Sequence, residues 1–145
     1  MTKKAENTFR DSIHKHLDRH LIHQEKTNNP FRSGMFDDWY SASPNDLWIE
    51  YKFQAKLGSV KAELSPLQFH WGSERFSEGR NVAVIVGMPQ GGIVLKYMEW
   101  QERIPVLEVE KRLLKRKQLA ELITEFTTCP YRQPTTQTLE LWEFL

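Results

Sequence analysis

The stretch GMFDDWYSASPNDLWIEYKF, residues 34–53, predicts two strands joined by a tight turn. The strands are expected over residues 37–42 and 47–53. The SPND sequence between them combines a proline, which presets φ, with Asn and Asp, which tolerate unusual backbone angles. Alternate side chains of a strand share a face. One face of the second strand therefore carries Trp48, Glu50 and Lys52, and the other is apolar, with Ile49, Tyr51 and Phe53, and should meet a core.

The polar face of this hairpin brings carboxylates and an ammonium group together. Glu50 and Lys52 are neighbours on it, and the acidic pair Asp37 and Asp38 lies on the preceding strand. Two carboxylates can hold Mg²⁺, which prefers oxygen ligands and keeps several waters for a phosphate substrate. A lysine placed two residues after the second carboxylate can orient a metal-bound water or help to deprotonate it. A structural Glu–Lys ion pair on a surface hairpin has the same spacing, so the spacing alone leaves both interpretations open.

The hairpin and the segment after it resemble the PD-(D/E)XK nuclease superfamily, and within it the small phage and prokaryotic nucleases of the VRR-NUC and Holliday-junction-resolvase type. The matching segments are SGMFD (residues 33–37), DLWIEYK (46–52) and LSPLQ (64–68), and the resemblance extends over residues 6–92. It implies that Asp37 and Glu50 bind metal, that Lys52 is the catalytic lysine, and that the carbonyl of Tyr51 adds a ligand. The metal implied is Mg²⁺ or Mn²⁺.

Two positions in this resemblance stay open. Phe36 stands where the family usually has the proline of its motif, which leaves Asp38 as a rival to Asp37, although Asp37 fits the register better. Gln68 corresponds to a glutamine that lies beside the active site in the resembling families. It is otherwise an ordinary polar position in the first turn of a helix, which Ser65 and Pro66 are expected to start.

The order of predicted elements agrees with the resemblance. Helices are expected over residues 4–24, 65–77 and 107–126, a buried strand over 81–87, and a further strand over 93–100. The pattern αββαβ is the core that the superfamily uses. We therefore expect an α/β, restriction-endonuclease-like fold with a small mixed central sheet flanked by helices. Residues 1–145 are expected to form a single domain, in which the apolar segment 129–145 is a C-terminal docking or dimerisation tail.

The first predicted helix carries two further candidates for the site. Glu6 falls on its apolar stripe, where a carboxylate is costly to desolvate. It is either a helix-start residue favoured by the macrodipole or an extra metal ligand or water-positioning group. Glu25, just past the helix, is a weaker alternative. Three histidines of this helix lie on neighbouring rows, but without a fourth ligand they are a weak zinc signal.

The net charge of +1 gives no overall attraction to nucleic acid, so a DNA-binding surface must be a local patch. The candidates are Arg32, Lys56 and Lys61, and the cluster Lys111, Arg112, Lys115 and Arg116 on the last predicted helix. Such a run is more often a solvated face, although in a nuclease it could grip phosphates. The single Cys129 suits a reducing cytosol, and no apolar run approaches a membrane span. A cytoplasmic protein of a bacterium or a phage-infected cell is expected.

Together these features predict a Mg²⁺-dependent DNA endonuclease, structure-specific in the manner of a junction resolvase and acting as a homodimer. A homing or sequence-specific endonuclease is the alternative within the same class. Outside it are a DNA-binding module that does not cut, and a protein whose Glu–Lys pair is purely structural.

Overall fold

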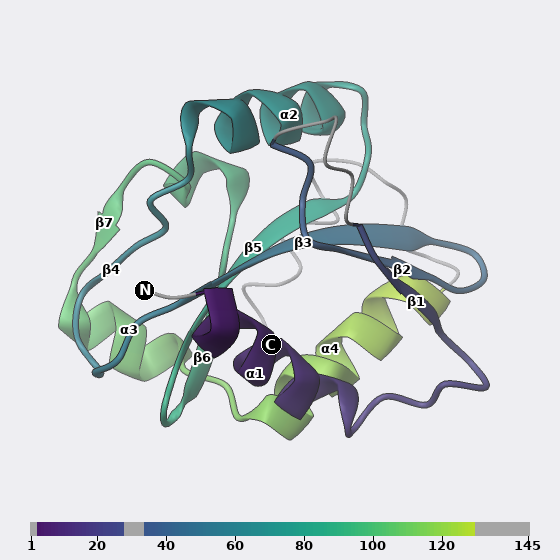
Figure 1. Cartoon of the computed structure of the whole chain (residues 1–145), viewed down its shortest axis with the longest axis horizontal. Helices are drawn as coiled ribbons and strands as arrows, with labels where there is room; N and C mark the ends of the chain where they lie inside the picture. The colour runs from purple at the N-terminus through teal and green to yellow at the C-terminus, as the bar shows by residue number, and fades with distance from the viewer. Residues whose placement is uncertain (1–2, 28–33, 130–145) are drawn as a thin grey trace.

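The computed structural model describes residues 3–27 and 34–129 (Figure 1). In chain order the elements are α1 (Lys3–His14), β1 (His23–Lys26), β2 (Asp38–Ser41), β3 (Asp46–Phe53), β4 (Val60–Lys61), α2 (Pro66–Ser77), β5 (Val82–Met88), β6 (Gly91–Leu95), the 3₁₀ helix η1 (Tyr97–Glu99), β7 (Arg103–Ile104), α3 (Val106–Arg112) and α4 (Arg116–Thr128). The expected helix, hairpin, helix and strand follow one another as predicted, with β1 inserted before the hairpin.

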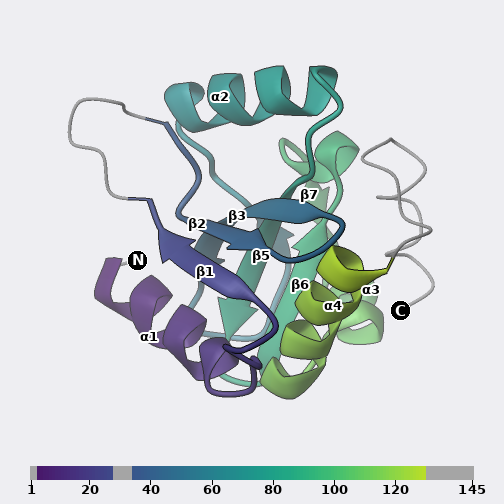
Figure 2. The same ribbon diagram turned by 90° about the vertical axis from the view of Figure 1, so that its right-hand side faces the viewer.

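Five strands form the main sheet in the order β1-β2-β3-β5-β6. All neighbours are antiparallel except β3 and β5, which are parallel and joined by the crossover through α2. Figure 2 shows α2 on one side of this sheet and α1 with α4 on the other. The predicted α/β class with a small mixed sheet flanked by helices is confirmed. A separate ladder of β4 and β7 lies outside the sheet.

The hairpin prediction is confirmed to within a residue at each strand end. Trp39 pairs with Trp48 and Asp38 with Ile49, and the intervening turn contains a cis Ser43–Pro44 bond. The alternation along β3 separates two cores. Ile49 and Tyr51 are buried with Phe9 and other residues of α1 and α4, whereas Trp48 packs against the cluster on the α2 side.

Helix α2 begins where the sequence predicted, and Ser65 forms a capping box with Gln68. Leu67, in the first turn, is 56% exposed and contributes little to the core. The tightest contact is instead at Gly72, where an added Cβ would come within 2.5 Å of the Phe36 ring and 2.7 Å of Trp100. This close approach explains why a glycine occupies a helix interior, where it costs stability.

The first helix is shorter than predicted: it ends at His14 and not at residue 24. The four-residue apolar spacing continues past this end, but the side chain of Asp18 accepts a hydrogen bond from the backbone N–H of His20 (2.9 Å) and supports a turn. Leu21 is then 51% exposed, and Ile22 takes the buried position. The polar segment that follows forms the edge strand β1, and its sequence lacks the hydrophobic alternation that would predict a strand.

The single helix predicted over residues 107–126 is also wrong, because the chain forms α3 and α4 with a break between them. At the break the backbone of Leu114 exchanges two hydrogen bonds of 2.9 Å with Gly92 at the edge of β6. This pairing satisfies the backbone without a helix, and it depends on Gly91, where an added Cβ would come within 2.2 Å of the Leu114 carbonyl oxygen. The strand expected over residues 93–100 stops at Leu95, and η1 follows it.

Two predictions fall on parts of the chain that the structure does not describe. Residues 130–145 include nearly all of the proposed docking tail, and residues 28–33 include Arg32. Within the described ranges, none of the helices combines the length and apolar character that crossing a membrane requires.

Candidate active site

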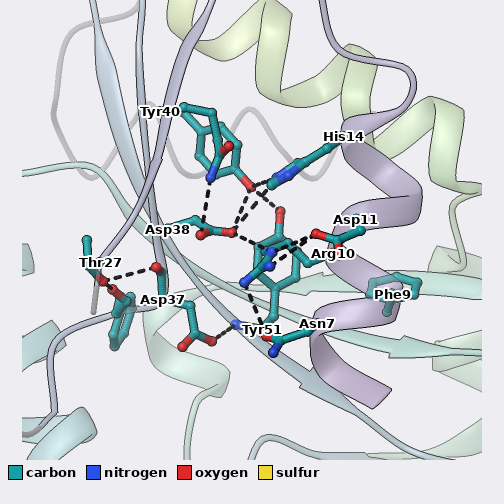
Figure 3. Close-up of polar contacts among 12 residues, drawn as sticks. Asn7, Phe9, Arg10, Asp11, His14, Thr27, Asp37, Asp38, Tyr40 and Tyr51 are labelled. Carbon is teal, nitrogen blue, oxygen red and sulfur yellow. Dashed lines mark hydrogen bonds and ion pairs between the residues drawn. The ribbon is translucent and has the colours of Figure 1, made fainter. Parts of the chain in front are cut away.

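The hairpin places Asp37 beside Glu50. Their strands pair as far as Asp38 and Ile49, and the same register carried one step further sets Asp37 opposite Glu50. Asp37 Oδ2 accepts a hydrogen bond of 3.1 Å from the backbone N–H of Tyr51, where β2 no longer supplies a partner (Figure 3). In a strand the N–H and C=O of one residue point to the same side. The Tyr51 carbonyl therefore faces the same side as its N–H, toward Asp37, as expected for an additional oxygen donor.

Gln68 connects the carboxylate and the ammonium group of β3. Its Nε2 donates to Glu50 Oε2 (3.0 Å), and its Oε1 accepts from Lys52 Nζ (3.1 Å). Lys52 Nζ also lies 3.8 Å from Glu50 Oε2. The same Oε1 accepts the backbone N–H of Ser65 (3.0 Å), so the cap of α2 orients the amide. The structure thus brings Gln68 into direct contact with the two β3 residues.

The charged form of Glu50 is disfavoured by its surroundings. Burial raises the pKa of its carboxyl well above the ordinary value, and the charge of Asp37 raises it further. Its side chain is 2% exposed, and its Oε1 is buried without a hydrogen-bond partner in the described structure. Two close carboxylates and an unsatisfied oxygen are the environment that a bound cation would stabilise.

The donor set available for such a cation is therefore Asp37, Glu50 and the Tyr51 carbonyl. Oxygen-only donors of this number suit Mg²⁺ or Mn²⁺, which keep waters in their remaining positions. In the described ranges no three His, Cys, Asp or Glu side chains are grouped to hold a metal, so the histidines near α1 form no zinc site there. In this donor set the third protein donor would be the main-chain carbonyl of Tyr51.

Glu6 reaches the same region from α1. Partial burial raises the pKa of its carboxyl, and its charge interacts with Lys52 and Asp37. With Lys52 it lines a cavity of about 370 Å³. Glu25, the alternative, lies on the exposed edge strand, 3.5 Å from His23, and does not line this cavity. The geometry therefore favours Glu6 over Glu25 as the supporting acid.

Asp38 points to the opposite face of the sheet. It is fully buried, and its Oδ2 lies 3.4 Å from Arg10 Nε and 3.5 Å from the hydroxyl of Tyr40 (Figure 3). That hydroxyl also contacts His14 Nε2 (2.7 Å) and the Tyr51 hydroxyl (2.6 Å). Asp38 belongs to this network, so the geometry favours Asp37 as the metal-binding residue.

The predicted basic patch is not a single surface, because the helix that would carry it is broken. Arg112 forms an ion pair of 2.6 Å with Glu99 and donates to the Val94 carbonyl. Arg116 donates to Ser12 Oγ (2.8 Å) and to the Pro89 carbonyl (3.1 Å). These contacts favour structural roles for the two arginines. Lys111 and Lys115 remain exposed, as do Lys56 and Lys61.

Ser59 and Arg103 are among the cavity-lining residues that the sequence did not predict. Neither lies in a recognisable motif. Arg103 reaches the cavity only because β7 pairs with β4, which is more than 40 residues away in the chain.

No protein-family model matches the sequence, and no curated protein resembles it significantly. Among solved structures the chain is similar to Hjc, a Holliday junction resolvase from the archaeal hyperthermophile Archaeoglobus fulgidus, with 15% sequence identity and a TM-score of 0.56. The match covers 79% of this chain and 98% of the resolvase chain. At this identity the likeness is one of fold, and the fold it shows is the restriction-endonuclease-like α/β fold that the sequence predicted.

Proposed function

We propose that this protein is a divalent-metal-dependent DNA endonuclease that hydrolyses phosphodiester bonds. The observation that carries the proposal is the convergence of Asp37, Glu50, Lys52 and Gln68 on one face of a resolvase-like sheet, with a buried Glu50 oxygen left unsatisfied. A purely structural Glu–Lys pair would not require this second carboxylate or the unsatisfied oxygen. A module that only binds DNA would have no use for two close carboxylates, because their charges repel the phosphate backbone.

The position of each site residue suggests its role in the reaction. Asp37, Glu50 and the Tyr51 carbonyl would hold Mg²⁺ or Mn²⁺, which lowers the pKa of a bound water and stabilises charge on the phosphodiester oxygens. Lys52 lies beside Glu50 and orients the attacking water. Gln68 holds the side chains of Lys52 and Glu50 in place through hydrogen bonds, and Glu6 contributes a further carboxylate from α1. Attack of the water on phosphorus breaks a P–O bond of the backbone.

A four-way junction is the DNA that we propose as the substrate, cut by a homodimer. The resolvase fold supports this choice. Resolution of a junction requires two paired cuts, and a two-fold symmetric dimer supplies two equivalent active sites. A sequence-specific enzyme of the same class would instead cut a linear duplex at a defined site.

Cleavage of labelled four-way junction, duplex and single-stranded DNA with Mg²⁺ or Mn²⁺ tests the proposal. Wild type should cut, and Asp37→Ala and Glu50→Ala should abolish cutting in either metal. Glu121→Ala, which removes an exposed carboxylate from α4, is the matched control and should cut like wild type. Wild-type protein that binds DNA but cuts none of these substrates in either metal would contradict the nuclease.

Metal binding is a second, independent readout. Titration calorimetry with Mn²⁺ should show a binding site in wild type that Asp37→Ala loses and Asp38→Asn keeps. Loss in Asp38→Asn with retention in Asp37→Ala would reverse the assignment of the two aspartates.

A further inference from the structure

The ladder of β4 and β7 holds two cations directly opposite each other. Its register pairs Val60 with Ile104 and Lys61 with Arg103. Val60 and Ile104 are buried, at 0% and 4% exposure, and anchor the ladder in the core on the α2 side. Because successive residues of a strand point to opposite faces, Lys61 and Arg103 project outward together, with Cβ atoms about 5 Å apart. Both residues are exposed.

This arrangement is unfavourable unless an anion is present, because like charges opposite each other destabilise a ladder. In the described part of the chain neither cation has an ion-pair partner. Arg103 Nη1 donates to Ser59 Oγ (3.1 Å). That hydrogen bond orients the guanidinium without neutralising it, and the remaining N–H groups stay available to a ligand.

The two cations share a cavity with the candidate active site. Lys61, Arg103 and Ser59 line the same hollow of about 370 Å³ as Glu6 and Lys52. Three cations (Lys52, Lys61 and Arg103) stand in it against two carboxylates (Glu6 and Glu63). The excess of one cation in the lining favours an anion.

We propose that Lys61 and Arg103 form a phosphate-binding pair that holds a backbone phosphate of the DNA strand beside the phosphodiester that is cut. The pair rests on the proposed nuclease function and extends its site by one phosphate. Arg103 supplies a planar fork that matches phosphate oxygens, and Lys61 supplies a point charge. A phosphate contact positions the strand without reading its sequence, so the pair acts on every sequence alike.

DNA binding measured without cleavage tests the pair. Fluorescence anisotropy of a labelled junction and a labelled duplex, in EDTA and over a range of KCl concentrations, would compare wild type with Arg103→Ala, Lys61→Ala and Ser59→Ala. Arg80→Ala is the matched control. Arg80 is also an exposed arginine, but it precedes the start of β5, whereas the cavity lies beside Val86 toward the other end of that strand. The same proteins would be assayed for cutting in Mg²⁺ and Mn²⁺.

We expect Arg103→Ala to weaken binding to both DNAs about tenfold and to lower the salt dependence by about one phosphate contact. Lys61→Ala should act in the same direction, and Ser59→Ala should have a smaller effect without changing the salt slope. Arg103→Lys, which keeps the charge, should recover the salt slope but only part of the affinity. Thermal unfolding midpoints of the alanine variants should equal or slightly exceed that of wild type, since Lys61 and Arg103 are exposed and each substitution removes the like-charge pair.

The outcomes separate the pair from the nuclease. Unchanged binding by Arg103→Ala, or equal weakening by Arg80→Ala, would overturn the pair even if wild type cuts DNA. Wild type that binds through Arg103 but cuts nothing would support the pair and overturn the nuclease. Wild type that binds neither DNA at low salt would overturn both.

Discussion

The two faces of the β2–β3 hairpin give their buried acids different surroundings. On the α2 face, Glu50 has an oxygen without a partner and a neighbouring carboxylate in Asp37. On the α1 face, Asp38 is enclosed by Arg10, His14 and Tyr40 within one network (Figure 3). Asp37 and Asp38 are consecutive in the sequence but lie on opposite faces of the sheet. The contrast supports the proposed metal site, because one face leaves a buried carboxylate oxygen unsatisfied, whereas the other pairs its acid with Arg10.

The largest effect should come from Lys52, whose loss removes function and little stability. Its side chain already lines the cavity of about 370 Å³, so Lys52→Ala widens that cavity without opening a new void in the core. We expect the cleavage rate to fall about 10²–10⁴-fold, the usual contribution of a positioned proton-transfer group, with an unchanged unfolding midpoint. Single-turnover cleavage beside a thermal melt measures both. A large drop in the midpoint would mean that Lys52 supports the fold and would weaken the contrast between the faces.

Arg10 should behave in the opposite way. Its side chain is 11% exposed and lies 3.4 Å from Asp38, and the Asp38 charge raises its pKa against the effect of burial. Arg10→Met keeps much of the volume but leaves Asp38 as an unpaired buried acid. The free energy of unfolding should fall by about 3 kcal/mol, measured by urea denaturation. The double variant with Asp38→Asn should recover part of the loss, and no recovery would show that the two side chains are not coupled.

His14 makes the closed network sensitive to acid. Burial, with the charges of Arg19 and Arg10, lowers its pKa from 6.5 to about 4, so the folded protein holds it neutral. The unfolded chain binds this proton first as the pH falls, and stability is lost below pH 6.5. Between pH 7 and pH 5 wild type should lose about 2 kcal/mol more than His14→Gln, in urea denaturation at both pH values.

Asp38 acts in the other direction over the same range, because burial raises its pKa to about 7. Because His14 Nε2 lies 3.8 Å from Asp38, the two proteins should be compared in an Asp38→Asn background, where the difference isolates the imidazole. Equal losses in both would show that His14 is protonated in the folded state.

The smallest effect, with a reversed sign, should be at Glu50. In metal-free protein at pH 7, Glu50→Gln removes a charge that burial and Asp37 both disfavour, and its amide oxygen can still accept from Gln68. The free energy of unfolding should rise, because a neutral amide costs less to bury than a carboxylate. Added Mn²⁺ should then stabilise wild type and not the variant. A destabilised metal-free variant would show that Lys52 already satisfies Glu50.

Much of the site could be predicted from the sequence because its signals are local. The alternation along β3 places Glu50 and Lys52 on one face. The serine that caps α2 and the proline that begins it locate Gln68 in the first turn. These features depend on strand period and helix capping, which a few consecutive residues encode. The fold class followed from their order, and the resolvase-like structure confirms it.

Tertiary structure alone decided the features that join distant segments. Leu114 leaves its helix because the edge of β6 offers backbone partners, and Arg112 points to Glu99. The strand β1 has no apolar pattern and exists because β2 has a free edge beside it. Arg103 reaches Lys61 only through strand pairing. Periodicity specifies which way a side chain faces, but its neighbours depend on which segments meet, and that depends on the whole core.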